Sequence, residues 1–257
     1  QFFDSQFTPI LSFSIGLLFV LFLAWFLFNK KISNHGNFSQ VISFKELIKR
    51  SNPMMLSATI YLLITWIDTL MIGMYKTETE VGIYNVAVRV SGLVSFGLAA
   101  VSSISAPKFS ETYNNGDIIN FEKIVHESSR LIFIFTLPIA LLLVIFNSTI
   151  LSLFGAEFVL AKNVLLILLV GQLFHAFSGS ISLILQMTGN EKAYRNYIFI
   201  GLILNIILNV SLIPSFGIVG AAIASSCSLI LWSVLSLVHI KKKFGFWTFH
   251  KIFSKFV

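Results

Sequence analysis

Two apolar stretches each carry one full charge. Asp68 lies in "YLLITWIDTLMIG" and Arg89 lies in "VGIYNVAVRV". Burying either charge alone in apolar surroundings is costly, whereas pairing the two lowers that cost and facing a water-filled cleft lowers it further. Helix ends near Tyr75 and Val81 would place both charges roughly 10 to 12 Å from the same membrane surface, at 1.5 Å per residue. We therefore expect Asp68 and Arg89 to stand level on adjacent antiparallel helices.

Other polar residues in apolar runs have milder chemistry. Asn205 and Asn209 are four residues apart and share one face of a helix, where they either hold neighbouring helices together or line a wet cavity. His175 lies in "GQLFHAFSG" with no nearby acid or second ligand, which favours a hydrogen-bonded structural histidine over a metal ligand or a catalytic base. Nucleotide-binding, hydrolase, metalloprotease and kinase motifs are absent, and Cys227 is the single cysteine. We predict no catalytic residue, no metal and no cofactor, and a protein that is not an enzyme.

The elements that position these residues must cross a membrane. Of the 257 residues 56% are hydrophobic and 11% charged, and the mean hydropathy of +0.87 is far above that of a soluble domain. A transmembrane helix needs about 20 mainly apolar residues. We predict an all-α integral membrane protein with seven such helices, near residues 10–28, 54–75, 82–106, 129–147, 160–187, 194–213 and 218–240.

The distribution of basic residues predicts the orientation. Fifteen of the 18 Lys and Arg residues fall in alternate loops and the C-terminal tail, whereas only Lys76 and Lys162 fall in the other loops. Because cytoplasmic loops carry the excess of Lys and Arg, the N-terminus of this chain is expected outside and the C-terminus in the cytoplasm. The net charge of +7 is thus explained by membrane topology, and a nucleic-acid partner is not expected.

The order of several segments is similar to that of a known transporter family. A basic loop leads into "NPMMLSATIYLLITWIDTLMIG" and "VGIYNVAVRV", followed by "SAPKFSETYNNGD", "ILSLFGAEF", "LILQMTGNEKAYRNY" and "LNIILNVSLIPSFGIVGAAIAS". From about residue 45 to 240 this pattern resembles the C-terminal lobe of polysaccharide flippases, the O-antigen-transporter-like branch of the MOP (MATE-like) exporter superfamily.

The resemblance implies a domain organisation. Members of the family have two six-helix lobes, so residues 1–30 would be the last helix of the N-terminal lobe and residues 31–52 a basic cytoplasmic loop between lobes. Residues 53–240 would form the six-helix C-terminal lobe, and residues 241–257 a basic amphipathic cytoplasmic tail. The chain begins with Gln1 and not with Met, so we expect it to start partway through a longer protein. The rest of the N-terminal lobe would be its partner.

The resemblance also implies a function. The chain would belong to a multi-pass protein of the bacterial inner (plasma) membrane, in contact with membrane lipids. It would move a lipid-diphosphate-linked oligosaccharide from the cytoplasmic to the outer leaflet by alternating access, for cell-surface polysaccharide synthesis. Substrate-binding residues would be Arg89, Asp68, Asn205 and Asn209. Arg89 suits a diphosphate because its planar fork grips two oxygens at once, with Asp68 orienting or releasing it.

Three alternatives stay open. The Asp68 and Arg89 pair could instead be a structural clamp between two helices. A cation-coupled drug or metabolite antiporter has the same architecture, although it would typically need a more acidic ion site. A polytopic membrane enzyme of polysaccharide assembly would need clustered His, Asp or Arg at one membrane face, which this sequence does not offer.

Overall fold

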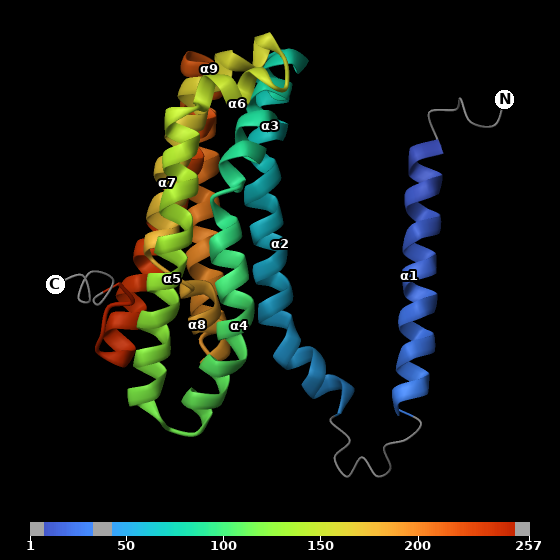
Figure 1. Ribbon diagram of the computed structural model, residues 1–257, viewed down its shortest axis with the longest axis vertical. Coiled ribbons are helices and arrows are strands. Elements are labelled where there is room, and N and C mark those ends of the chain that lie inside the picture. The colour runs from blue at the N-terminus through green and yellow to red at the C-terminus, as the bar shows by residue number, and fades with distance from the viewer. Residues whose placement is uncertain (1–7, 33–42, 250–257) are drawn as a thin grey trace. The chain divides into compact units, whose positions relative to one another are not determined.

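The computed structural model describes residues 8–32 and 43–249, and every regular element within those ranges is a helix (Figure 1). The chain divides into two compact units, Gln1–Leu47 and Ile48–Val257, which are considered separately. In the first unit, α1 (Thr8–Ile32) presents apolar side chains all around its axis between residues 13 and 27, as expected of a helix in lipid.

The second unit contains the helices that build the candidate site. Within it, α4 packs on α5, α7 packs on α9, and α3 packs on α7. α2 begins at Phe44 and contains Pro53 in its interior, and its part that is apolar enough to cross a membrane, Ser51–Tyr75, is close to the predicted range 54–75. The elements are α2 (Phe44–Tyr75), α3 (Glu78–Gly92), α4 (Ser95–Asn114), α5 (Ile118–Ile145), α6 (Asn147–Ser152), the 3-10 helix η1 (Ala156–Ala161), α7 (Lys162–Phe177), α8 (Ile181–Met187) and α9 (Glu191–Phe244).

The described residues contain four helices long and apolar enough to cross a membrane, or five if α3 and α4 form one bent span. The seven transmembrane helices predicted from the sequence are therefore not shown. Two predicted spans are broken. The range 82–106 is divided between α3 and α4, which are bent by 46°, and the range 160–187 is divided between α7 and α8. Apolar composition did not reveal the break between α3 and α4, since Leu93 and Val94 are apolar, and the polar residues 178–180 between α7 and α8 were not used as a signal.

The 54 residues of α9 form two antiparallel arms. At Gly217 the backbone has φ 57° and ψ −137°, which is not helical. A Cβ atom built on Gly220 would lie 2.5 Å from the carbonyl oxygen of Leu212, and one built on Gly201 would lie 3.0 Å from the Trp232 ring. Residues far apart in a straight helix are thus in contact. The two arms cover the ranges near 194–213 and 218–240 that were predicted as separate helices.

The connection between α7 and α8, residues 178–180, is held by polar side chains, and we call it the serine break. Gly179 has φ 75°, and a Cβ atom there would lie 2.3 Å from Oγ of Ser129 in α5. The hydroxyl oxygens of Ser102 and Ser180 are 2.7 Å apart, and Thr248 Oγ1 donates to the carbonyl oxygen of Ser178 at 2.8 Å. The Thr248 hydroxyl thus satisfies a backbone carbonyl oxygen that the interrupted helix leaves unpaired.

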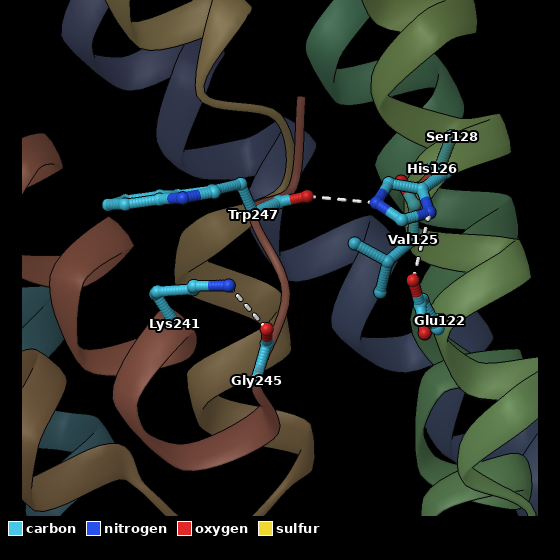
Figure 2. Close-up of polar contacts among 7 residues, drawn as sticks. All are labelled: Glu122, Val125, His126, Ser128, Lys241, Gly245 and Trp247. Atoms are coloured by element: carbon cyan, nitrogen blue, oxygen red, sulfur yellow. Dashed lines mark hydrogen bonds and ion pairs between the residues drawn. The ribbon is translucent and has the colours of Figure 1, made fainter. Parts of the chain in front are cut away.

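Residues 245–249 turn back after α9 and pack on α5, and we call them the C-terminal strap. Figure 2 shows His126 Nε2 hydrogen-bonded at 2.8 Å to the carbonyl oxygen of Trp247, while Glu122 lies 3.8 Å from the other ring nitrogen. Phe246 is buried against Phe121 and His126. The sequence predicted an amphipathic tail over residues 241–257. Phe246 of this range packs inside the unit, and residues 250–257 lie outside the described range.

Candidate functional site

A tight connection between α2 and α3 brings Asp68 opposite Tyr84. Thr77 caps α3 through a reciprocal pair of hydrogen bonds with Glu80, which fixes the start of that helix. Tyr84 Oη then donates to Asp68 Oδ2 at 2.8 Å, and Thr69 Oγ1 donates to the side-chain oxygen of Asn85 at 3.1 Å. The two helices are therefore joined by polar side chains on the faces they present to each other.

Both arms of α9 also bind the Asp68 carboxylate. From the first arm, the side-chain amides of Asn205 and Asn209 donate to Oδ1 at 3.0 and 2.6 Å, and from the second arm the Ser225 hydroxyl donates to Oδ2. With Tyr84, the carboxylate accepts four hydrogen bonds, from α3 and from both arms of α9. We call these five residues the Asp68 cluster.

The electrostatics of the Asp68 cluster are unbalanced. Asp68 is only 3% exposed, and no Lys, Arg or His of the described residues pairs with it. The side-chain oxygen of Asn209 is buried and accepts no hydrogen bond. A buried carboxylate without a counter-charge is costly even when it is fully hydrogen-bonded. A proton on Asp68, or a small monovalent cation held by the carboxylate and neutral oxygens, would neutralise it.

The described residues contain no group of three His, Cys, Asp or Glu side chains that could bind a metal ion together. The Asp68 cluster therefore offers one carboxylate with amide and hydroxyl oxygens, a ligand set of hard oxygen donors with a single negative charge. That set does not resemble the multi-acid or thiolate sites of divalent and transition metals.

A cavity of about 150 Å³ lies beside the Asp68 cluster. This is room for several water molecules, which need polar partners of the kind found here. Asp68 could therefore exchange a proton or a cation with water when the cavity is open. Besides apolar residues, polar side chains from four helices line it: Tyr61, Thr65, Asp68, Tyr84, Ser91, Gln172, Ser225 and Ser226.

Arg89 is not part of the Asp68 cluster, so the expected charge pair was wrong. Arg89 is exposed and forms no ion pair with Asp68. Tyr84 is the residue of α3 that lies opposite Asp68. Arg89 lies five residues further along α3, about 7.5 Å along the helix axis and about 140° around it, so it cannot also stand opposite Asp68. The estimate from the sequence compared only depths and started α3 near Val81, whereas the helix begins at Glu78.

The structure brings together three of the four predicted site residues, Asp68, Asn205 and Asn209. Two members of the cluster were missed by sequence reasoning. Tyr84 carried a usable signal, because it follows the connection between α2 and α3 by about the same distance as Asp68 precedes it. Ser225 is one of several serines in its segment, and nothing in the sequence distinguishes it from Ser226 or Ser228. His175 is hydrogen-bonded, as predicted, with Nδ1 3.0 Å from Ser233 Oγ.

Comparison with known proteins gives the family. Residues 53–211, more than half of the chain, match the model of the family described as MatE. The chain belongs to the MatE family. This family consists of membrane transporters and not of enzymes, so the chain is part of a multi-pass membrane protein and the predicted alternative of a membrane enzyme is excluded.

Curated relatives of this MatE-family chain come from archaea. A probable low-salt glycan biosynthesis flippase, Agl15 of Haloferax volcanii, is 31% identical over 172 residues, which cover 66% of this chain and 36% of that protein. A probable flippase of the same organism, AglR, is 31% identical over 184 residues, covering 69% of this chain and 38% of that protein. The chain thus spans less than two fifths of either relative. The bacterial location expected from the sequence is not shown.

Solved structures establish the MATE-like fold. A multidrug resistance MATE family transporter of the MOP superfamily in an outward-facing conformation superposes with a TM-score of 0.61 at 23% identity. A MOP superfamily transporter from Pyrococcus furiosus superposes equally well. Each comparison covers 77% of this chain and 46% of the other.

Proposed function

We propose that this chain is part of a transporter that moves a lipid-diphosphate-linked oligosaccharide between membrane leaflets by alternating access. The likeness to two probable flippases supports the substrate class. The observation that carries the mechanism is the Asp68 cluster, a buried carboxylate without a cationic partner among the described residues that joins α2, α3 and both arms of α9.

The Asp68 cluster is proposed to couple an ion to the movement of helices. When Asp68 is ionised, it accepts hydrogen bonds from Tyr84, Ser225 and both asparagines and draws the four segments together. A proton on the carboxyl, or a cation beside the free oxygen of Asn209, changes which of these hydrogen bonds are favourable. Asn205 and Asn209 are therefore assigned to holding Asp68, and they contact the glycan only when the cluster opens.

Arg89 is proposed to contact the diphosphate of the substrate. Its guanidinium is exposed, lies on α3 about one and a half turns from Tyr84 toward the other end of the helix, and is not neutralised by an acid of the described residues. An exposed arginine in an apolar segment is expected to face a wet cleft in the whole transporter, because facing lipid would be costly. In that position it can bind two phosphate oxygens at once.

The test of this proposal is export of the glycan by the whole protein in cells that lack the flippase. We expect Arg89→Ala to reduce export by roughly 10- to 100-fold, the loss of a charged hydrogen-bonded contact, and Arg89→Lys to recover only part of it. Arg195→Ala, which removes another cation of the same lobe, is the matched control. Equal export by wild type and Arg89→Ala at the same protein level would contradict the role of Arg89.

Asp68→Asn separates ion coupling from substrate binding. We expect a well-expressed protein that still binds the lipid-linked glycan but no longer responds to a proton or sodium gradient. Export that keeps its response to both gradients would contradict coupling at Asp68.

A cation-coupled drug antiporter remains the second candidate, and the Asp68 cluster suits ion coupling in either case. Drug susceptibility of the same cells discriminates the two functions. Increased drug sensitivity on deletion, with normal surface glycan, would favour the antiporter and contradict the flippase.

A further inference from the structure

A second cavity, of about 510 Å³, lies where the second arm of α9 ends beside the start of the first arm. It is far in sequence from Asp68 and shares no lining residue with the cavity there. This end of the unit carries Lys241, Lys242 and Lys243, and the distribution of basic residues predicts it to face the cytoplasm. The lining residues are Asn190, Tyr197, Leu235, Val238, His239, Lys242 and Lys243.

The positive charge of this cavity is not neutralised. Lys243 Nζ donates to the side-chain oxygen of Asn190 at 2.7 Å, which is a neutral partner. Lys242 is exposed, and neither lysine forms an ion pair within residues 43–249. The acid nearest in sequence to Asn190 is Glu191, which is not a lining residue. Two adjacent cations at the mouth of one cavity attract an anion.

His239 adds a ring nitrogen that has no hydrogen-bond partner among the described residues. Tyr197 Oη and His239 Nδ1 are 2.8 Å apart, and when the hydroxyl donates to Nδ1 the proton of the neutral ring is on Nε2. Nε2 is buried and has no hydrogen-bond partner among the described residues. A buried donor left unpaired costs free energy. An anion with several acceptor oxygens would satisfy it together with the lysines.

Leu235 and Val238 give the cavity an apolar side one turn further into the membrane-spanning arm. A ligand that fits this arrangement has an anionic head at the lysines and a hydrocarbon part that continues along the helix. We propose that this cavity binds the phosphate head group of a membrane lipid. Basic pockets between transmembrane helices on the cytoplasmic side have the right chemistry for such head groups.

The phosphate could come from two sources, a bulk anionic phospholipid or the diphosphate of a polyprenyl lipid. Only the second source depends on the proposed function. Binding is measured on the full chain purified in detergent, by native mass spectrometry with phosphatidylglycerol, polyprenyl diphosphate or phosphatidylcholine added. We expect the first two lipids to bind more tightly than the zwitterionic third. A preference for phosphatidylglycerol indicates bulk lipid, and a preference for the diphosphate indicates the transported carrier.

Variants then locate the binding. Lys242→Ala with Lys243→Ala should weaken binding of either anionic lipid by roughly 25-fold, at about fivefold per lysine. The matched control is Lys123→Ala with Lys192→Ala, which removes two exposed cations outside the cavity. Lys242→Arg with Lys243→Arg keeps the positive charge and should keep the affinity for anionic lipid. This variant therefore separates recognition of the lipid charge from an effect of substitution on folding.

Three results would overturn the proposal. One is equal affinity for phosphatidylglycerol and phosphatidylcholine, and another is an equal loss in the cavity variant and in its control. The third is a loss of binding in the arginine variant when its melting temperature is unchanged. Glycan export by the lysine variants is measured in parallel, and normal export with lost phosphatidylglycerol binding would support a lipid site distinct from the substrate path.

Discussion

The serine break and the Asp68 cluster are both buried polar groups of the second unit, but their hydrogen bonds have different roles. At the serine break, polar side chains serve the backbone, since Thr248 donates to a carbonyl oxygen that the interrupted helix leaves free. In the Asp68 cluster every donor is directed at one side-chain carboxylate, and no backbone group requires it. The serine break is explained by folding alone. The Asp68 cluster is not, because an apolar residue at position 68 would avoid burying a charge.

This difference predicts opposite responses to substitution. Polar residues at the serine break should be important for stability and unimportant for ion coupling. Removing the charge of Asp68, while keeping its hydrogen-bonding capacity, should leave stability nearly unchanged and abolish coupling. The variants below test that contrast by the melting temperature of the full chain in detergent.

The largest effect is expected for Asp68→Leu. Leucine removes the acceptor of four donors, of which only Asn209 keeps another acceptor, Asn205 Oδ1, at about 1–3 kcal/mol for each of the other three that finds no new partner. We therefore expect the free energy of unfolding to fall by roughly 4 kcal/mol or more. Asp68→Asn is the matched control, because the hydroxyls of Tyr84 and Ser225 can rotate to accept from its amide. Equal melting temperatures for the Leu and Asn variants would show that the hydrogen bonds of the cluster are not important for folding.

Gly179→Ala is expected to have the second largest effect. The new Cβ must adopt a left-handed backbone conformation and approach Ser129 Oγ at 2.3 Å, so we expect a loss of roughly 2–4 kcal/mol. Gly189 is the matched control, because its φ is 72° and nothing lies within 4 Å of a Cβ atom there. Gly189→Ala should cost only the backbone strain, about 1 kcal/mol. If both variants have the same melting temperature, the close approach of residue 179 to Ser129 does not affect stability.

Sequence reasoning located some of these features and missed others for physical reasons. Asp68 was recognisable as a charge in an apolar segment, and the four-residue spacing of Asn205 and Asn209 placed both amides on one helix face. Their common partner depends on how α9 folds back at Gly217, which a single-sequence pattern does not determine. The position of Arg89 was misjudged because depth was considered without rotation about the helix axis.

A smaller effect is expected for Thr248→Val in the C-terminal strap. The substitution preserves the shape of the side chain but removes the donor to the Ser178 carbonyl, so we expect a loss of about 1 kcal/mol. Thr59→Val is the control, because Thr59 is exposed and its hydroxyl donates only to Met55 within the same helix. A melting temperature unchanged by Thr248→Val would mean that water replaces the threonine at the serine break.

The smallest effect concerns Asp117, an exposed acid that provides a reference for the buried Asp68. Asp117 caps α5, and hydrogen bonds from the Asn120 side chain and then from the Asn120 backbone lower the pKa of its carboxyl. Because the folded pKa lies below the unfolded one, the stabilisation is fully present above the ordinary carboxyl pKa and is lost as the pH falls through the folded pKa. Asp117→Asn retains a capping oxygen and does not titrate.

The advantage of Asp117 over asparagine should therefore be constant near neutral pH and shrink as the pH is lowered below about 4. Melting temperatures of both proteins across this range measure it. A difference that stays constant down to the lowest pH would show that the cap does not distinguish a charged oxygen from a neutral one. At an exposed cap, losing the hydrogen bonds that favour a charged carboxylate costs little free energy, because water can replace the donors. The same kind of donor set around Asp68 is closed off from bulk water, so a change of charge on that carboxyl must be accommodated by the helices themselves.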